Sequence, residues 1–288
     1  MPNAAVNLAS AAAPPAGQHM GAGNFYGAIH GKREQCGAIF TDLRHSVPRK
    51  LPMHSHELSF FALLLDGHYG ERYGRRQTQF GPFTLMFRPA GIPHQDEIGP
   101  RGVHLYEIEL RPCWQKRLAD CSAELDTPRD EISGGPLLWL SLKLFREVQS
   151  SPVPDDLTIE SLLTEILAHA ARPAHPESRL TPPWLPRILD KLKAEHCRRL
   201  SLDELAREAG VHPVHLSRVF RRCVGKGLGE YVHRLRVRTA CERMLTPHTS
   251  LADLSFETGF ADQSHFTRSF RKITGQTPAA FRSLFCTA

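Results

Sequence analysis

The chain has 288 residues, of which 41% are hydrophobic, so it is long enough for two domains with separate cores. No apolar run approaches the roughly 20 residues that a membrane-spanning helix needs, and the seven cysteines are scattered without a C-x-x-C pair. We therefore expect a cytoplasmic protein with reduced thiols, away from the membrane. From residue 180 onward Lys and Arg outnumber Asp and Glu by 18 to 10, and before it they number 18 against 20, which suggests a basic module that meets a polyanion.

The first segment, residues 1–24, is rich in Ala, Gly and Pro and carries few large apolar side chains. Such a composition cannot bury enough apolar surface to offset the entropy of ordering, so we expect disorder there. The first folded domain is expected over residues 25–172.

Short apolar segments separated by glycine and proline follow between residues 35 and 111: CGAIF, ELSFFALLLDG, FTLMFRPAG and VHLYEIELRP. Their alternation and the turn residues between them are typical of antiparallel strands. We predict a small antiparallel β-barrel or sandwich.

Two helices are predicted after these strands, GPLLWLSLKLFREV and DLTIESLLTEILAHAAR. The second helix carries an apolar stripe that needs burial. This stripe can pack on the strands of its own chain or pair with its copy, and we favour the second arrangement, a homodimer. Its members are Ile159, Leu162, Leu163, Ile166, Leu167 and Ala170.

Five prolines lie in the segment ARPAHPESRLTPPWLPR. Because proline cannot continue a helix and restricts the residue before it to extended backbone, we place a linker at residues 173–186. A second domain, all-α, is expected over residues 187–288.

The second domain repeats itself: SLDELAREAG begins at residue 201, and SLADLSFETG begins at residue 250. Each copy opens with a serine followed three residues later by Glu204 or Asp253, a pattern that predicts a helix N-cap. Each ends with a glycine, Gly210 or Gly259, where the chain turns sharply. A second helix follows each glycine, so the repeat predicts two helix-turn-helix units.

The second helices of the two units combine an apolar face with a polar and basic outer face, as does a helix that enters the major groove of DNA. Their sequences are PVHLSRVFRRCVG and DQSHFTRSFRKITG. A plain helical hairpin explains the apolar spacing equally well but does not explain why basic outer faces occur twice. The segment LGEYVHRLRVRTACERML predicts a helix of roughly 25 Å between the copies. Such a spacer could hold two recognition helices on consecutive major-groove faces, about 34 Å apart. The apolar faces are formed by Leu216, Val219, Phe220, Phe266 and Phe270.

Residues 180–282 resemble the DNA-binding domain of AraC/XylS-type bacterial transcription regulators. The segment GFADQSHFTRSFRKITGQTPAAFR is similar to the family signature along its length. The first copy is looser, and the run from His212 to His215 replaces residues that set base preference, so base preference does not transfer. The signature positions include Gly259, Phe260, Phe266, Arg268, Phe270, Gly275 and Pro278.

The resemblance implies which side chains contact DNA. Arginine can bind guanine bidentately, glutamine can bind adenine, and the methyl groups of valine and threonine can touch thymine. The expected base-contacting residues are Val214, Ser217, Arg218, Gln263, Ser264, Thr267 and Arg268. The expected phosphate-contacting residues, whose role is salt-sensitive and blind to sequence, are Arg221, Arg222, Lys226, Arg271 and Lys272.

The segments LPMHSHE and GPFTLMFRPAGIPHQDE of the first domain resemble the paired cupin motifs, with His54, His56 and His94 in the histidine positions. Cupin metal sites also use a glutamate three or four residues beyond the second histidine, where phenylalanines stand here. Glu57 follows His56 directly and points to the opposite face of a strand. We therefore expect neither a metal nor another cofactor, and keep a three-histidine zinc or iron site as the alternative.

The resemblance instead implies an effector pocket inside the barrel. Its expected lining is His54, His56, Phe60, Tyr69, Phe87 and His94.

The interpretation is an α+β protein with a cupin-like antiparallel β-barrel, a helical dimerisation segment and a C-terminal double helix-turn-helix domain. It predicts a sequence-specific, effector-responsive transcription regulator rather than an enzyme. Its expected partners are double-stranded promoter DNA, RNA polymerase, a small-molecule effector and a second copy of the chain. In the family that this chain resembles, activation of transcription is commoner than repression. The alternatives are a metal-dependent cupin enzyme with an appended DNA-binding domain and a constitutive DNA-binding protein with an inert barrel.

Overall fold

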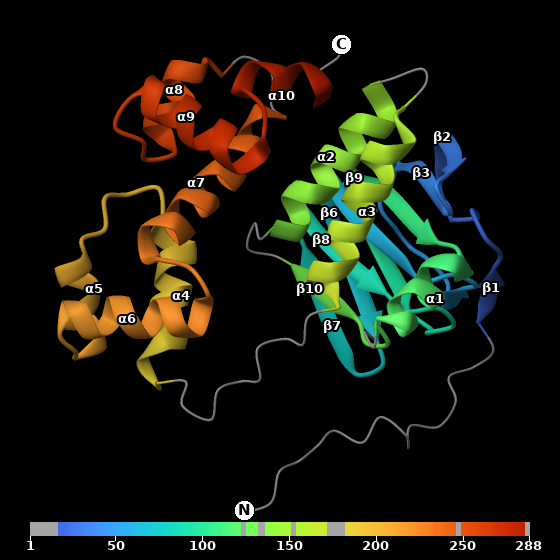
Figure 1. The fold of residues 1–288 in the computed structure, drawn as a ribbon, viewed down its shortest axis with the longest axis horizontal. Coiled ribbons are helices and arrows are strands. Elements are labelled where there is room, and N and C mark those ends of the chain that lie inside the picture. The colour runs from blue at the N-terminus through green and yellow to red at the C-terminus, as the bar shows by residue number, and fades with distance from the viewer. Residues whose placement is uncertain are drawn as a thin grey trace, which may run out of the picture.

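The computed structural model describes residues 17–121, 125–131, 136–150, 154–171, 182–245 and 249–285. Figure 1 shows a β-rich N-terminal region beside an all-α C-terminal region, which confirms the predicted combination of the two kinds of structure. No helix in the described part is long and apolar enough to cross a membrane.

The N-terminal strands are β1 (Gln18–Met20), β2 (Ala28–Gln35), β3 (Ala38–His45), β4 (Arg49–Lys50), β5 (His54–His56), β6 (Phe60–Tyr73), β7 (Arg76–Phe80), β8 (Thr84–Arg88), β9 (Gln95–Leu110) and β10 (Arg129–Glu131). Three helices belong to the same region: α1 (Pro112–Asp120), α2 (Pro136–Ser150) and α3 (Asp156–Ala170). The C-terminal region consists of α4 (Trp184–Glu195), α5 (Leu202–Ala209), α6 (Pro213–Val224), α7 (Leu228–Met244), α8 (Leu251–Glu257), α9 (Gln263–Thr274) and α10 (Pro278–Phe285).

The main sheet has the strand order β10-β8-β6-β9-β3-β2, with antiparallel neighbours throughout. In addition, β4 pairs with β9 and β7 pairs with β6. Strands β1 and β5 form a separate, two-stranded parallel sheet. The four apolar segments predicted as strands contribute to β3, β6, β8 and β9. The sequence did not predict β2 and β7, because both are short of large apolar residues.

The sheet bends in the middle of β6 and β9. The pairing of these strands shifts on either side of Gly67, whose φ is +87°. A Cβ at Gly67 would lie 2.1 Å from the carbonyl oxygen of Gly102 on β9, so only glycine allows the two backbones to approach this closely. The bend lets β6 pair first with β8 and then with β7.

The alternation along β6 and β8 gives the sheet two buried faces. Phe61, Leu63 and Leu65 pack in a cluster with α2 and α3, and this side is called the helix face below. Phe60, Ala62 and Leu64 point the other way, into a separate cluster that also contains Tyr69, Phe80, Met86 and Ile98. We call that side the inner face.

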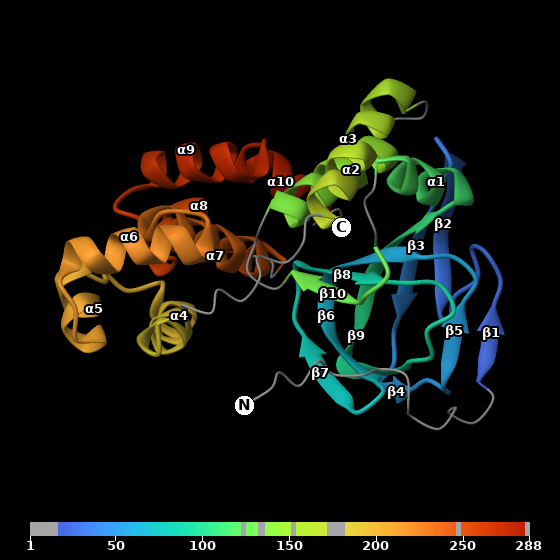
Figure 2. The ribbon, with the colours of Figure 1, turned by 60° about the horizontal axis from the view of Figure 1, so that its bottom comes forward.

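Helices α2 and α3 lie together across the helix face (Figure 2). The apolar stripe of α3 is buried inside the chain, with Ile159, Leu163 and Ile166 fully covered. Of the two alternatives for this stripe, packing within the chain is therefore observed, and a dimer seam would need another surface.

Each helix-turn-helix unit begins and turns as predicted. The hydroxyls of Ser201 and Ser250 accept hydrogen bonds from the backbone N–H groups of Glu204 and Asp253, both at 3.0 Å. Gly210 and Gly259 have φ values of +67° and +83°. A Cβ at Gly259 would lie 2.2 Å from the carbonyl oxygen of Cys197, so this turn requires glycine for space as well as for conformation.

The apolar faces of α6 and α9 are buried as predicted. Leu216, Val219 and Phe220 pack in one cluster with α4, α5 and the first half of α7. Phe266 and Phe270 pack with the second half of α7, α8 and α10, in the cluster that continues onto α2 and the sheet. Phe220, Phe266 and Phe270 are therefore core residues.

Helix α7 joins the two helix-turn-helix units, with α5 and α6 at one end and α8 and α9 at the other (Figure 1). Its 17 residues span roughly 25 Å. Tyr231, Val232 and Leu235 belong to the core of the first unit, and Val237 and Ala240 belong to the core of the second.

Arg236 of α7 ties the two units together. Its guanidinium donates hydrogen bonds to the carbonyl oxygens of His196 at 2.7 Å and Arg198 at 2.9 Å, beside the first unit, and to that of Gly259 in the second. These three carbonyls end helices or occupy turns, so they need a donor from elsewhere. Burial lowers the pKa of Arg236.

Disorder is predicted for residues 1–24, and residues 1–16 of this segment lie outside the described residues. From residue 17 onward the expectation is wrong, because β1 pairs with β5. Backbone N–H groups of Ala22 and Gly23 donate to Glu57 and Glu109 at 3.0 and 2.7 Å, so hydrogen bonds order this segment without large apolar side chains. Most of the predicted linker lies outside the described residues, but α4 already begins at Trp184, inside its expected end.

We expect the Phe270→Ala substitution to destabilise the C-terminal region by about 3–5 kcal/mol, because it empties a fully buried aromatic site. Chemical denaturation followed by circular dichroism measures this loss. Phe256→Ala is the matched control, since Phe256 is 64% exposed on α8, and should change stability by less than about 0.5 kcal/mol. Equal effects of the two substitutions would contradict the assignment of Phe270 to the core.

We expect Arg236→Ala to lower the unfolding free energy by about 1.5–3 kcal/mol, the range for hydrogen bonds to a charged group. Arg243→Ala is the control, because Arg243 forms only an exposed ion pair with Glu257, worth about 0.2–1 kcal/mol. Urea denaturation of both variants measures the difference. A loss for Arg236→Ala no larger than for Arg243→Ala would show that the three carbonyls do not depend on Arg236.

Candidate functional site

Helices α6 and α9 present polar faces on the side away from their cores. In α6, Val214, Ser217 and Arg218 are exposed, and Val214 is 67% exposed although it is apolar. In α9, Gln263, Ser264 and Arg268 are exposed and Thr267 is half-buried.

The N-caps of these helices hold the exposed residues in place. The side chain of Asp262 accepts a hydrogen bond from the backbone N–H of His265 at 2.6 Å, one turn before Arg268. In α6 the ring nitrogen of His212 accepts from the backbone N–H of Val214 at 3.3 Å, and Pro213 occupies the first turn. Both helices end at a glycine with positive φ, Gly225 or Gly275.

Several basic side chains around α6 and α9 form ion pairs, namely Lys191, Arg198, Arg234, Arg238 and Arg243. Arg187 of α4 and Arg207 of α5 form none with a described residue. No ion pair with a described residue is formed by Arg218, Arg221, Arg222, Arg268, Arg271 or Lys272. Six positive charges are thus left without internal neutralisation on two helices, which is the electrostatic pattern of a surface that binds a polyanion.

A cluster of three histidines lies on the inner face of the sheet. His54 and His56 come from β5, and His94 precedes β9 and forms a backbone bridge with His54. The three rings are buried, with centroid separations of 4.4 Å between His54 and His94 and 5.1 Å between His54 and His56. Phe25 and Phe60 cover His56 at 4.7 and 4.8 Å.

Backbone carbonyls fix two of these rings. The Nδ1 atoms of His54 and His94 lie 3.0 and 3.1 Å from the carbonyl oxygens of Pro52 and Ile92. The opposite nitrogens face Asp96 of β9, with Nε2 of His54 3.5 Å and Nε2 of His94 4.0 Å from its carboxylate oxygens. Burial lowers the pKa of His56 to about 2, so its ring is neutral at physiological pH.

Further carboxylates lie on the inner face beyond Asp96. The guanidinium of Arg88 donates two hydrogen bonds from Nε to Glu71, at 2.7 and 2.9 Å, and one from Nη1 to Asp130 at 2.9 Å. Glu107 is buried, and burial raises its pKa well above the usual value.

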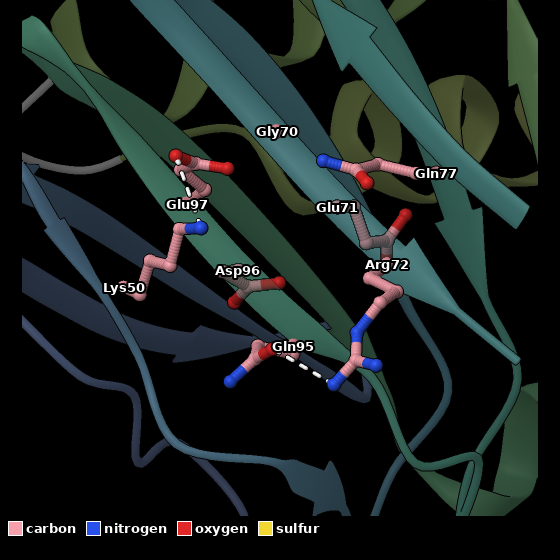
Figure 3. A pocket seen from close by; sticks show the side chains of 8 residues that line it. All are labelled: Lys50, Gly70, Glu71, Arg72, Gln77, Gln95, Asp96 and Glu97. Carbon is pink, nitrogen blue, oxygen red and sulfur yellow. Dashed lines mark hydrogen bonds and ion pairs between the residues drawn. The ribbon is translucent and has the colours of Figure 1, made fainter.

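A cavity of about 260 Å³ opens beside Asp96 and Glu71. Figure 3 shows the eight lining residues, which come from β4, β6, β7 and β9. Lys50 pairs with Glu97, and Arg72 donates to Gln95, so the rim charges are largely matched. The cavity is polar, and a small polar molecule or ion fits it better than an apolar one.

The structure brings together four of the six predicted pocket residues: His54, His56, Phe60 and His94. Tyr69 lies in the same apolar cluster as Phe60. Phe87 does not belong with them, because it alternates to the helix face and stacks on Phe61 at 4.9 Å. The predicted orientation of Glu57 is confirmed, since Glu57 is exposed and accepts from the backbone of Ala22.

Sequence reasoning missed the charged residues of the inner face. These are Glu71, Arg88, Asp96 and Glu107. Alternation along β8 would have pointed to Arg88, which ends an otherwise apolar strand. The missing information was the pairing of β6 with β9, which places Glu71 opposite Asp96.

Comparisons with known proteins point to one family. A family model described as a helix-turn-helix domain matches residues 205–283. The HTH-type transcriptional activator AarP of Providencia stuartii is 35% identical over 95 residues, which are 33% of this chain and 70% of AarP. The probable transcription factor PqrA of Proteus vulgaris is 36% identical over 83 residues, which are 29% of this chain and 68% of PqrA.

A solved structure, a transcriptional regulator with an AraC-type DNA-binding domain from Chromobacterium violaceum, is 25% identical with a TM-score of 0.34, covering 36% of this chain and 94% of that one. The chain belongs to the AraC-type family of DNA-binding transcriptional regulators.

Proposed function

We propose that α6 and α9 enter consecutive major grooves of promoter DNA and read its sequence. The proposed base contacts are Val214, Ser217 and Arg218 from α6 and Gln263, Ser264, Thr267 and Arg268 from α9. Their exposure beside the N-caps of the two helices supports this assignment, because recognition helices contact bases mainly through their N-terminal residues. The observation that carries the proposal is the set of six exposed cations on these two helices that form no ion pair with a described residue.

The cations farther along the two helices are proposed to hold phosphates. Arg221 and Arg222 lie in the last turn of α6, and Arg271 and Lys272 lie in the last turn of α9. Lys226 follows α6 and is half-buried. Phosphate contacts fix the register of a protein on the duplex, while base contacts give the sequence preference. Affinity should therefore fall steeply with salt.

Helix α7 is proposed to set the spacing of the two DNA contacts. It contributes to both cores, and Arg236 ties its middle to both units, so neither unit can rotate without breaking buried contacts. This rigidity favours two half-sites about one helical turn apart on one side of the duplex.

The N-terminal region is proposed to be a cupin-like barrel, domain 25–172 extended by β1, that binds a small-molecule effector at the inner face. The second unit is in direct contact with this region. The tilted rings of Phe83 and Phe281 of α10 have centroids 5.6 Å apart, and Nη2 of Arg238 donates to the carbonyl oxygen of Pro82 at 3.1 Å. Phe83 follows β7 and precedes β8, which carries Met86 and Arg88 of the inner face. An effector that shifts β8 would thus alter how the second helix-turn-helix unit packs against the N-terminal region.

The remaining parts of the proposal concern assembly and the sign of regulation. We propose a homodimer whose seam uses surface other than the buried stripe of α3, for example the exposed Leu157. The name of AarP, an activator, favours activation, with RNA polymerase as the partner at the promoter. The effector then acts by its differential affinity for two arrangements of the dimer.

We expect Arg268→Ala to relax discrimination at one base position, at a cost of about 1–3 kcal/mol for the preferred duplex only. Lys272→Ala should weaken preferred and random duplexes about equally and reduce the salt slope by about one. Fluorescence anisotropy on both kinds of duplex at several salt concentrations measures these effects. If both substitutions weaken preferred and random DNA to the same extent, the division into base and phosphate contacts is wrong.

We expect Phe83→Ala to remove the effect of effector binding on the affinity for DNA. In the wild-type chain, a small molecule that raises the melting temperature should also change the Kd for operator DNA. In the Phe83→Ala variant, the same molecule should still raise the melting temperature but leave the Kd for operator DNA nearly unchanged. Thermal melts and anisotropy titrations with and without the molecule give both readouts. An unchanged shift of Kd in Phe83→Ala would contradict coupling through this contact.

A further inference from the structure

We propose that helix α2 of the N-terminal region takes part in DNA binding, with Lys143 and Arg146 as contacts to phosphate oxygens beside the groove that α9 enters. These contacts depend on the proposed role of α9 in DNA binding, and they extend the DNA surface beyond the two helix-turn-helix units. The N-terminal region would then add affinity that is blind to DNA sequence.

Helix α2 is buried on most of its surface, because it packs against β8, α3 and α9. Between residues 138 and 149 its exposed residues are Lys143, Arg146 and Gln149. Residues three apart are neighbours on a helix surface, so these three form one exposed stripe. Two of the three side chains in the stripe carry a positive charge.

The charges of this stripe are not neutralised within the described part of the chain. Neither Lys143 nor Arg146 forms an ion pair with a described residue. Glu147 is the only acidic residue in the sequence of α2. Its carboxylate accepts a hydrogen bond from the backbone N–H of Asp155 at 3.3 Å, so it is turned toward the start of α3. The exposed stripe of α2 is therefore basic, as are the outer faces of α6 and α9.

The side chain of Lys143 lies against the C-terminal end of α9. A Cβ added to Gly275, which ends this helix, would lie 2.8 Å from Cε and 3.6 Å from Nζ of Lys143. The last turn of α9 carries Arg271 and Lys272, the proposed phosphate contacts of the second unit. The cations of α9 and of α2 thus meet at one place on the surface.

A lysine at the C-terminus of a helix also interacts favourably with the partial negative charge there. This interaction explains the position of Lys143, but it does not explain why the next exposed residue of the stripe is Arg146. Like charges that are held near one another repel, and an anion between them removes the repulsion. A polyanion that runs past the end of α9 fits this arrangement of cations.

Apolar contacts hold α2 in place beside α9. Side chains of α2 share one core cluster with Phe266 and Phe270 of α9. The ring contact between Phe83 and Phe281 joins the same two regions. Lys143 and Arg146 are therefore presented from a fixed helix, which lowers the entropy lost when they bind.

The spacing of the two cations suits a DNA strand. Lys143 and Arg146 are about 4.5 Å apart along the helix axis, and the phosphates of one strand succeed one another about every 3.4 Å along the duplex axis. Their long side chains can therefore reach neighbouring phosphates. Figure 1 shows α2 beside the second unit, with α6 at the other end of α7, so these phosphates belong to the end of the DNA site that α9 reads.

The test is the salt dependence of DNA binding by the full-length chain, measured by fluorescence anisotropy on preferred and random duplexes. Each phosphate contact contributes about 0.9 to the slope of the logarithm of affinity against the logarithm of salt concentration. We expect Lys143→Gln and Arg146→Gln each to reduce the slope by about 0.9, and the double substitution to reduce it by about 1.8, with equal weakening of both duplexes. An unchanged slope for the double substitution would overturn the proposal.

The matched control is the double substitution Arg75→Gln and Lys116→Gln. It removes the same charge from exposed residues in the turn before β7 and in α1, which lie away from α9 (Figure 1). It should keep the wild-type slope, as should Lys143→Arg, which retains the positive charge. An equal reduction of the slope by the control would show that net charge rather than contact is responsible, and would overturn the proposal.

Lys272→Ala in the same assay separates this proposal from the role of α9. A reduced slope for Lys272→Ala and an unchanged slope for the α2 variants would reject the contacts of α2 and leave those of α9 intact. Unchanged slopes for all of these variants would reject both.

Ethylation interference locates the contacts on the DNA. Phosphates at the α9 end of the site whose ethylation blocks binding of the wild-type chain should no longer do so with the double α2 variant. Thermal melts of the free proteins accompany this measurement. A lower melting temperature with an unchanged interference pattern would show that Lys143 and Arg146 act only in the fold, and would overturn the proposal.

Discussion

One helix, α7, supplies the core of both DNA-binding units, and the geometry of the C-terminal region depends on this sharing. Tyr231, Val232 and Leu235 complete the first core, and Val237, Ala240 and Met244 complete the second, within a single 17-residue helix. Because a helix rises 1.5 Å per residue, the distance between the two cores is a property of the backbone rather than of side-chain packing. Arg236, between the two apolar groups, adds donors for the turns on either side. Recognition helices that are held in this way pay little ordering entropy when they bind.

The N-terminal region depends on a different constraint, the two-residue period of β6, β8 and β9. One set of side chains packs under α2 and α3 in the cluster that reaches the second DNA-binding unit. The alternate set lines the inner face with apolar side chains, carboxylates and Arg88, beside the histidines of β5 and the segment before β9. A structural change on the inner face therefore occurs in the same strands whose opposite side packs in the core shared with α9 and α10. This proximity gives the proposed effector response a physical route that needs no large motion.

The sequence allowed accurate predictions wherever a signal was local. N-caps at Ser201 and Ser250, the turns at Gly210 and Gly259 and the burial of Phe266 and Phe270 all follow from short-range spacing, and all are confirmed. Predictions failed where the outcome depended on pairing between distant segments. Phe87 was assigned to the wrong face, β1 was missed because its order comes from β5, and the place of Asp96 beside the histidines depends on the register of β9. The favoured pairing of the α3 stripe with its copy is not observed for the same reason, since α2 and the sheet of the same chain cover the stripe.

The central claim is that two rigidly spaced helices read two DNA segments, and selection from a pool of random-sequence duplexes tests it most directly. The purified full-length chain is mixed with the pool at physiological salt, and the retained duplexes are sequenced after several rounds. The account predicts enrichment of two short conserved blocks whose centres lie about one helical turn, 10–10.5 base pairs, apart. Enrichment of a single block, or of two blocks at variable spacing, would contradict the rigid arrangement imposed by α7.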